Sequence, residues 1–252
     1  MTEGSLHDLS IKPLTVSLSF KVKLMSAVFV FFFLYVGTEV AYGQFIATFS
    51  IRHSDFTERR AAMLTSVYWG MFALARGLAV PLSRCMTPSK MLISSIVITL
   101  LSAGGLTAVT YLNKSVIFIW TLSGTLGVGM AAIFPTGVLW LEDHIKVTAK
   151  MASIFVIASS LGEMVIPALV GFFIDHTGPQ VLMLTVLLCS AGCAVVFCLM
   201  VFIASVSSNQ YQSLRRNEAI PMNTFEFSSD EDTDNEPILR SNGKRHKWAQ
   251  QT

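Results

Sequence analysis

The stretch from Leu24 to Phe49, LMSAVFVFFFLYVGTEVAYGQFIATF, decides the fold class of this chain. Its 26 residues extend roughly 39 Å as a helix at about 1.5 Å each, enough to cross a hydrocarbon core of about 30 Å. A single carboxylate, Glu39, falls near the middle. Because an ionised side chain at that depth costs on the order of 3 kcal/mol, we expect Glu39 to face protein, water or a bound cation.

Composition places the whole chain in the membrane class. Of its 252 residues, 52% are hydrophobic and only 13% are charged, with a mean hydropathy of +0.59. Soluble domains carry about a quarter charged residues, so the composition predicts an integral membrane protein in contact with the lipid bilayer. A formal charge of +2 is too small to indicate a nucleic-acid partner. The four cysteines show neither a disulfide framework nor a metal-ligand pattern, so we expect no metal site.

Five more apolar segments follow the first, each long enough to span a bilayer. The sequence therefore predicts an all-α, polytopic membrane protein in three parts: a cytosolic N-terminal segment (1–23), a six-helix transmembrane domain (24–204) and a disordered cytosolic tail (205–252). The first apolar run is about twice as long as the apolar region of a signal peptide. We therefore expect it to remain in the mature protein as a membrane span. The six predicted spans are Leu24–Phe49, Ala62–Leu82, Met91–Leu112, Val116–Leu141, Met151–Ile174 and Val181–Ala204.

Lysine and arginine set the predicted orientation. With a cytosolic N-terminus, the segments near the inner surface hold nine of these residues and the outer loops hold four. The positive-inside rule then places both ends of the chain in the cytosol. The inner residues are Lys12, Lys21, Lys23, Arg84, Lys90, Lys146, Lys150, Arg215 and Arg216, and the outer ones are Arg52, Arg59, Arg60 and Lys114.

Two short patterns in the tail resemble membrane-trafficking signals. One is Tyr211-Gln-Ser-Leu214, a tyrosine followed by a bulky apolar residue, and the other is Asp234 ahead of Ile238-Leu239. We read them as candidate contacts for clathrin adaptors. The alternative is a plain solvated tail, because such short patterns also arise by chance.

Charged residues inside the spans are the first candidates for function. Glu39 lies about fifteen residues from the cytosolic start of its span and Glu163 about twelve, so their depths agree within roughly 5 Å. Two carboxylates near one another favour a bound cation or proton, and we expect one or both of them to bind the coupling ion. The alternative is a buried hydrogen-bond network in which Glu163 pairs with Arg76. Arg76 lies toward one end of its span, so it can also snorkel to the headgroups.

The pattern of six spans, with charge-free third and sixth segments and a glycine-rich fourth, resembles the C-terminal half of a major facilitator superfamily transporter, built from two three-helix inverted repeats. Three motifs carry the resemblance: Gly77-x-x-x-Pro81-x-x-Arg84-x-x-x-Pro88 after the second span, Pro167-x-x-x-Gly171-x-x-x-Asp175-x-x-Gly178 at the end of the fifth, and Gly37-Thr-Glu-Val-Ala-Tyr-Gly43. They are most similar to the branch of fucose permeases and sodium-dependent glucose carriers.

The resemblance implies sodium-coupled uptake of glucose or a related sugar, by alternating access, at the apical plasma membrane. It also implies a missing N-terminal half or a second subunit, and a cytosolic gate formed by Arg84 and Glu142. Polar and aromatic groups near mid-depth are the candidate sugar ligands, since sugars bind to amides and flat apolar faces: Gln44, Tyr42, Thr38, Tyr68, Trp69 and Trp120. The rival hypothesis is a non-transporting membrane protein that acts as a regulatory or trafficking partner. A channel is less favoured, and no motif indicates an enzyme.

Overall fold

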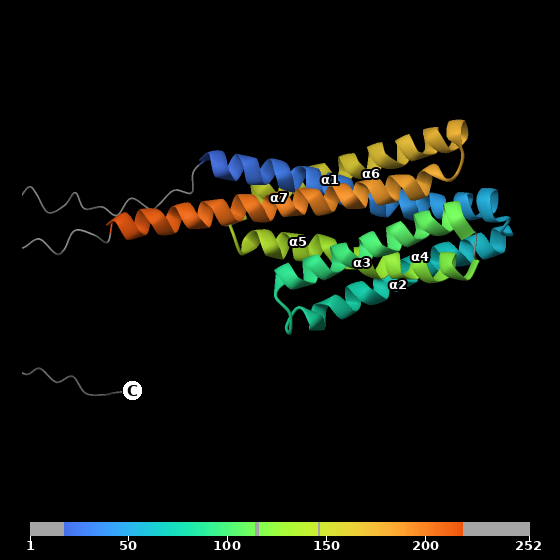
Figure 1. The fold of residues 1–252 in the computed structure, drawn as a ribbon, viewed down its shortest axis with the longest axis horizontal. Helices are drawn as coiled ribbons and strands as arrows, with labels where there is room; N and C mark the ends of the chain where they lie inside the picture. Colours follow the sequence, from blue (N-terminus) through green and yellow to red (C-terminus); the bar gives the residue numbers. More distant parts are fainter. Residues whose placement is uncertain (1–17, 114–115, 146, 219–252) are drawn as a thin grey trace, which may run out of the picture. The chain divides into compact units, whose positions relative to one another are not determined.

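Helices make up nearly all of the described chain. The structure, a computed structural model, describes residues 18–113, 116–145 and 147–218. Six helical spans in this part are long and apolar enough to cross a membrane, which confirms the six predicted from hydropathy (Figure 1). The elements are α1 (Leu18–Ser54), α2 (Glu58–Leu82), α3 (Pro88–Ala108), the π-helix η1 (Val109–Asn113), α4 (Val116–Ala131), α5 (Ile133–Glu142), α6 (Ala149–Thr177) and α7 (Val181–Glu218).

Two helices are longer than hydropathy predicts. α1 begins at Leu18 instead of Leu24, and α7 runs to Glu218 instead of ending at Ala204. Both helices therefore continue past the apolar runs, and the Tyr211 pattern falls on helix. The division of the chain at residue 205 stays a prediction. The last residues of α7, 212–218, belong to a second unit, Gln212–Thr252. The Asp234 pattern lies outside the described residues.

The fourth predicted span is broken in two. α4 ends at Ala131 and α5 begins at Ile133, with Ala132 between them at φ −94° and ψ −8°. Pro135 explains the break, because it has no N–H to donate to the carbonyl of Ala131, four residues earlier. The discontinuity therefore follows from the position of Pro135 within the span.

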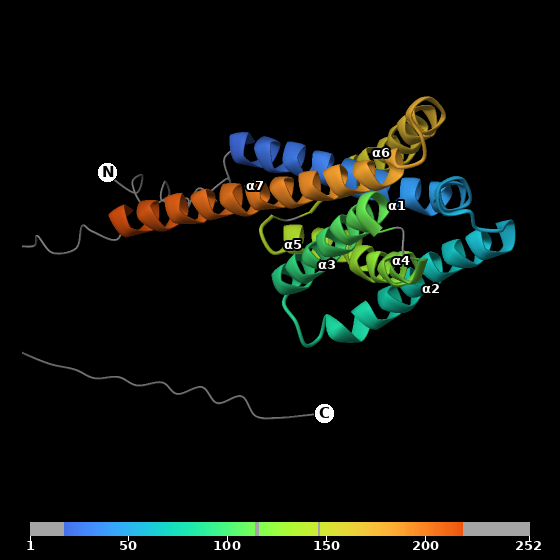
Figure 2. The same cartoon turned by 45° about the vertical axis from the view of Figure 1, so that its right-hand side comes forward.

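The helices of the first unit pack in pairs. α1 runs along α6, α2 along α4, and α3 along α4 and α5 (Figures 1 and 2). α7 lies beside α3, where the Thr107 hydroxyl donates to the Met183 carbonyl at 3.1 Å. Spans one to three are α1, α2 and α3, and spans four to six are α4 with α5, α6 and α7. In both sets, the first span packs against the second span of the other set, as the pairs α1–α6 and α4–α2 show. This is the relation that two structural repeats produce.

Glycines set the closest of these approaches. A β-carbon on Gly127 of α4 would lie 2.6 Å from the Tyr68 carbonyl oxygen of α2, and one on Gly129 would lie 2.8 Å from the Thr99 amide of α3. Both distances are too short for a real side chain. Gly127 and Gly129 of the fourth span therefore serve close helix packing.

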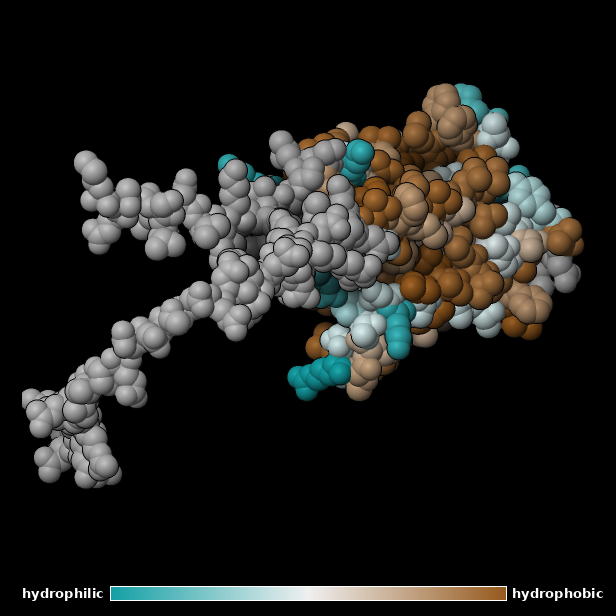
Figure 3. Space-filling model, turned by 60° about the vertical axis from the view of Figure 1, so that its left-hand side comes forward, coloured by the Kyte–Doolittle hydropathy of each residue, from teal (hydrophilic) through white to brown (hydrophobic). Residues whose placement is uncertain are grey.

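Apolar side chains fill the interior and also cover the outer faces of the helices. Phe31, Phe32 and Trp140 are among the largest side chains that are fully buried. On the outside, Leu101 is 71% exposed and Ile117 is 73% exposed. The face shown in Figure 3 is mostly apolar, with hydrophilic residues gathered toward its ends. Such a surface is unfavourable in water and suits lipid or a partner protein.

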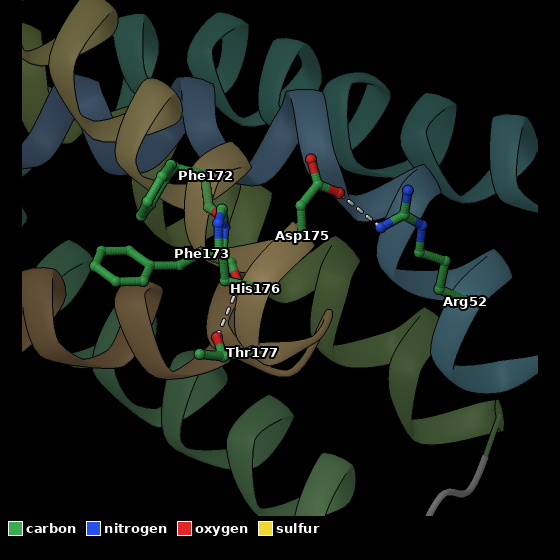
Figure 4. A network of polar contacts seen from close by, with 6 residues as sticks. All are labelled: Arg52, Phe172, Phe173, Asp175, His176 and Thr177. Carbon is green, nitrogen blue, oxygen red and sulfur yellow. Dashed lines mark hydrogen bonds and ion pairs between the residues drawn. The ribbon is translucent and has the colours of Figure 1, made fainter.

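The C-terminal ends of α1 and α6 are joined by an ion pair. Arg52 Nη1 lies 3.0 Å from Asp175 Oδ1 (Figure 4). Just beyond it, Asp55 takes a left-handed conformation, φ 52°, and the Phe56 N–H donates to the Ser50 carbonyl at 3.1 Å. These contacts end α1 and turn the chain into α2.

Candidate functional site

The crossing of α1 and α6 brings the two predicted ion-coupling carboxylates to the same level. Gly37 of α1 faces Gly162 of α6, and a β-carbon on Gly37 would lie 2.6 Å from the Gly162 carbonyl oxygen. Glu39 follows Gly37 by two residues, and Glu163 is next to Gly162. The crossing therefore puts the two carboxylates at one level along the helices. Because two residues turn a helix by about 200°, Glu39 lies on a different face of α1 from Gly37.

Glu39 is held from several sides. Its side chain is partly buried, and one turn earlier on α1 the Tyr35 hydroxyl donates to the Met130 carbonyl of α4 at 2.9 Å. Its backbone carbonyl accepts a hydrogen bond from the Tyr68 hydroxyl of α2 at 3.2 Å. Glu163, by contrast, is exposed on the surface of α6. The two carboxylates therefore differ in solvent access, because Glu39 is partly buried and Glu163 is exposed. Glu39, Glu163 and Arg76 form the carboxylate cluster that is the candidate ion site.

Arg76 is exposed and bound to a neighbouring helix. Its Nε donates to the Ala131 carbonyl of α4 at 3.1 Å, and its guanidinium lies 4.4 Å from the centre of the Phe72 ring. Snorkelling stays a prediction, because an exposed side chain toward one end of its span can still reach the headgroups. Arg76 and Glu163 form no ion pair in the described chain. Sequence alone does not show which carbonyl an intramembrane Arg reaches.

Two of the candidate sugar ligands are core residues in this conformation. Tyr42 and Tyr68 are 0% exposed, and their rings meet edge to face with 4.9 Å between centroids. The Tyr42 hydroxyl shares a hydrogen bond of 2.6 Å with Ser123 Oγ. Tyr68 is bonded to the Glu39 carbonyl. A sugar can reach either ring only if the helices rearrange, and their role as ligands stays a prediction.

Thr38 and Trp120 lie apart from the carboxylates. The buried Thr38 hydroxyl donates to the Leu34 carbonyl at 2.6 Å and faces a small cavity. Trp120 is half-buried near the beginning of α4 and stacks on Phe56 of the α1–α2 loop, with 6.3 Å between ring centroids. The structure therefore does not group these two residues with Glu39 and Glu163.

Gln44 and Trp69 remain accessible. Gln44 of α1 is exposed, and Trp69 of α2 is 37% exposed. Trp69 lies directly against α1, because a β-carbon on Gly43 would come within 2.4 Å of its indole ring. An amide and an aromatic face beside a carboxylate cluster suit a ligand rich in hydroxyls.

The two predicted gate residues are both exposed and lie apart. Arg84 follows α2 and Glu142 ends α5, each on the predicted cytosolic side. They are not within ion-pair distance in this conformation, since Arg52–Asp175 is the one such pair in the described chain. Their pairing in an inside-closed state stays a prediction.

One feature was missed by sequence reasoning. A cavity with about 10 Å³ of space for water lies between α1, α3 and α7, lined in part by Tyr35, Thr38 and Cys193. Two further lining residues, Thr99 and Ser190, are at least nine-tenths buried, and neither hydroxyl has a hydrogen-bond partner among the described residues. Isolated Ser and Thr residues in apolar spans give no signal that they face each other.

The described residues contain no group of three or more His, Cys, Asp and Glu side chains that could hold a metal ion. The fold and the site together define a six-helix membrane domain with two carboxylates and one arginine inside the spans. Intramembrane groups of this kind mark ion and substrate pathways in transporters. The sequence profile of the Major Facilitator Superfamily matches residues 11–233, so the chain belongs to that superfamily of transport proteins.

Within the superfamily, the chain is similar to several characterised relatives. It is 40% identical over 151 residues to sodium-dependent glucose transporter 1 of Homo sapiens, covering 59% of this chain and 28% of the relative. The protein of the same name from Xenopus laevis is 37% identical over 187 residues, which are 73% of this chain and 37% of the relative. A more distant relative is major facilitator superfamily domain-containing protein 4A of Mus musculus, 25% identical over 164 residues, 65% of this chain and 30% of its own. The chain spans about a third of the length of these relatives.

Proposed function

We propose that residues 24–204 form the C-terminal half of a carrier that takes up glucose or a related sugar together with Na⁺ at the plasma membrane, apically in epithelia. The observation that supports the proposal is that the Gly37–Gly162 crossing puts Glu39 and Glu163 at one level within the spans. Two carboxylates and one guanidinium leave a formal charge of −1 in the cluster. One monovalent cation balances that charge.

The sugar site is proposed to lie beside the cluster, against Gln44 and the exposed face of Trp69. Tyr42 and Tyr68 support the helices behind it, through their contacts with Ser123 and Glu39. Their removal would alter the site through the helix positions, whereas removal of Gln44 would remove a direct ligand. The names of the relatives agree with glucose as substrate and Na⁺ as the coupled ion.

Alternating access in this superfamily takes place between two halves. We propose that this chain pairs with an N-terminal half, supplied by a second polypeptide or by a longer form of the same protein. The lipid bilayer surrounds the other faces. Clathrin adaptors are proposed partners for the tail patterns.

Uptake of labelled glucose tests the proposal. The chain is expressed alone and together with the N-terminal half of the human relative, and uptake is measured in Na⁺ and in choline. We expect Na⁺-dependent uptake only in the paired sample. If the paired sample shows Na⁺-independent uptake, the sodium part is wrong. If it shows no uptake while both halves reach the surface, the protein acts as a non-transporting partner.

The carboxylates are tested in the same assay. Glu39→Gln and Glu163→Gln keep the side-chain size and remove the charge. We expect both to weaken Na⁺ dependence, Glu39→Gln more strongly because Glu39 lies inside the cluster. The matched control is Asp175→Asn, which removes an exposed carboxylate at the end of α6. Unchanged Na⁺ and pH dependence in both glutamine variants would leave packing as the role of the two glutamates.

A further inference from the structure

The carbonyl of Ala131 has lost its normal partner. In an unbroken helix, the N–H of the residue four positions later would donate to it, and that residue is Pro135, which has no N–H. A carbonyl without a partner inside a membrane span is costly, because no bulk water is available to replace the helical bond. The break at Ala132 therefore needs a donor from elsewhere in the protein.

Arg76 supplies that donor from another helix. Its Nε–H donates to the Ala131 carbonyl at 3.1 Å, and Phe72, one turn earlier on α2, lies under the guanidinium at 4.4 Å. The contact thus ties α2 to the end of α4, just before the break. The other four N–H donors of the guanidinium have no hydrogen-bond partner among the described residues.

Two hydrogen bonds place the same guanidinium in the neighbourhood of Glu39. Tyr35, one turn before Glu39 on α1, donates to the Met130 carbonyl at 2.9 Å, next to the carbonyl that Arg76 binds. Tyr68, one turn before Phe72 on α2, donates to the Glu39 carbonyl at 3.2 Å. Arg76 is therefore under two attractions, one toward a helix-end carbonyl and one toward the two carboxylates. A cation bound at the carboxylates would reduce the second attraction and leave the first unchanged.

We propose that Arg76 is a positioning residue that couples cation binding at Glu39 and Glu163 to the break between α4 and α5. With the cation bound, Arg76 stays on the Ala131 carbonyl and holds the break. Without it, the guanidinium shifts toward the carboxylates and the break loosens. This inference rests on the proposed function, because it uses the same cation site, and it adds a route from that site to a movable helix joint.

The test uses one substitution to replace the missing bond. Pro135→Ala restores an N–H that can donate to the Ala131 carbonyl, so it should make Arg76 dispensable for holding the break. Hydrogen–deuterium exchange over residues 126–142 is measured in lipid nanodiscs for the wild-type chain, Arg76→Gln, Pro135→Ala and the double variant. In choline, we expect Arg76→Gln to exchange about threefold to tenfold faster than the Pro135→Ala and double variants.

Matched variants separate this effect from general loosening. Arg52→Gln removes a different hydrogen-bonded arginine, at the outer end of α1, and should leave exchange at the break unchanged. Pro167→Ala alters an intramembrane proline of a different helix, α6, and should not rescue Arg76→Gln. Arg76→Lys keeps the charge but loses the Nε donor, and serves if Arg76→Gln does not fold. Rescue by Pro167→Ala, or no rescue by Pro135→Ala, would overturn the positioning role.

A second arm adds Na⁺. We expect exchange at the break in the wild-type chain to slow about twofold to threefold in Na⁺ relative to choline, and this difference to vanish in Glu39→Gln. If radioactive Na⁺ binds the chain but exchange does not change, the coupling is wrong and the proposed function stands. If no Na⁺ binds, both the cation site of the proposed function and the coupling to it are wrong. The rescue experiment in choline then still decides whether Arg76 holds the break.

Discussion

Gly37 and Gly162 meet so closely that neither position has room for a side chain. A β-carbon on Gly162 would lie 2.1 Å from the Phe33 carbonyl oxygen, and one on Gly37 would lie 2.5 Å from the Ile166 side chain. The backbones of α1 and α6 are therefore in direct contact at the level of Glu39 and Glu163. The helix crossing that builds the candidate ion site depends on these two glycines.

The first prediction is that Gly162→Ala destabilises the protein. The new methyl group would meet backbone, which cannot rotate away, so α6 must move from α1 at a cost of about 1–3 kcal/mol. That cost lowers the melting temperature by roughly 2–12 °C for a chain of this size, and the shift moves Glu163 away from the level of Glu39. Gly70→Ala is the control, because a β-carbon there meets nothing within 4 Å. Equal melting temperatures for the two variants would contradict the close crossing.

The second prediction concerns the unpartnered hydroxyl of Thr99. A buried hydroxyl without a partner costs about 1–3 kcal/mol, and Thr99→Val removes it at nearly constant volume. We expect a higher melting temperature in detergent micelles. Thr110→Val is the control, because Thr110 is equally buried but its hydroxyl donates to the Leu106 carbonyl at 2.7 Å. A lower melting temperature for Thr99→Val would indicate that a water bridges Thr99 and Ser190 in the cavity.

Sequence patterns predict the scaffold of this protein because each span is a local property. Hydropathy and length identify the six spans, and Pro135 marks the break that separates α4 from α5. Glu39 and Glu163 could be matched in depth because rise per residue is constant in a helix. Glycines in the fourth span indicate close packing, and Gly127 against Tyr68 is an instance of it.

Helix rotation and pairing are much harder to predict. Whether Tyr42 and Tyr68 face a substrate path or each other depends on how α1 and α2 are turned, and in the structure they face each other. The bond from Arg76 to Ala131 joins residues 55 positions apart, on helices whose neighbours no local pattern reveals. Thr99 and Ser190 likewise line one cavity only through the packing of α3 and α7.

The third prediction is the topology, with the α1–α2 loop outside and the α2–α3 loop in the cytosol. Each loop has an exposed position in it or next to it. Arg59 lies in the first turn of α2, next to the α1–α2 loop, and the native Cys85 lies in the α2–α3 loop. Arg59→Cys should react with a membrane-impermeant maleimide in intact cells, whereas Cys85 should react only after permeabilisation. Cys85→Ser provides the background. Labelling of Cys85 in intact cells, with Arg59→Cys protected, would invert the orientation.

The fourth prediction concerns the gate formed by Arg84 and Glu142. Both are exposed and unpaired in this conformation, so their contact would form only when the path closes on the cytosolic side. A partly exposed ion pair contributes about 1 kcal/mol, which shifts a nearly balanced equilibrium about fivefold. Arg84→Glu and Glu142→Arg alone should therefore slow uptake by the assembled carrier, because each places like charges opposite one another in the closed state.

Combining the two reversals should restore uptake, since the pair is re-formed with its charges exchanged. The matched control reverses Arg52 and Asp175, an ion pair on the opposite side whose side chains are 52% and 68% exposed. The Arg52–Asp175 pair is already formed in this conformation, so reversing its charges should affect a different step of the transport cycle. The interaction energy between Arg84 and Glu142 should stay unchanged. If the Arg84→Glu, Glu142→Arg double variant transports no faster than the slower single variant, the two residues do not act as a gate.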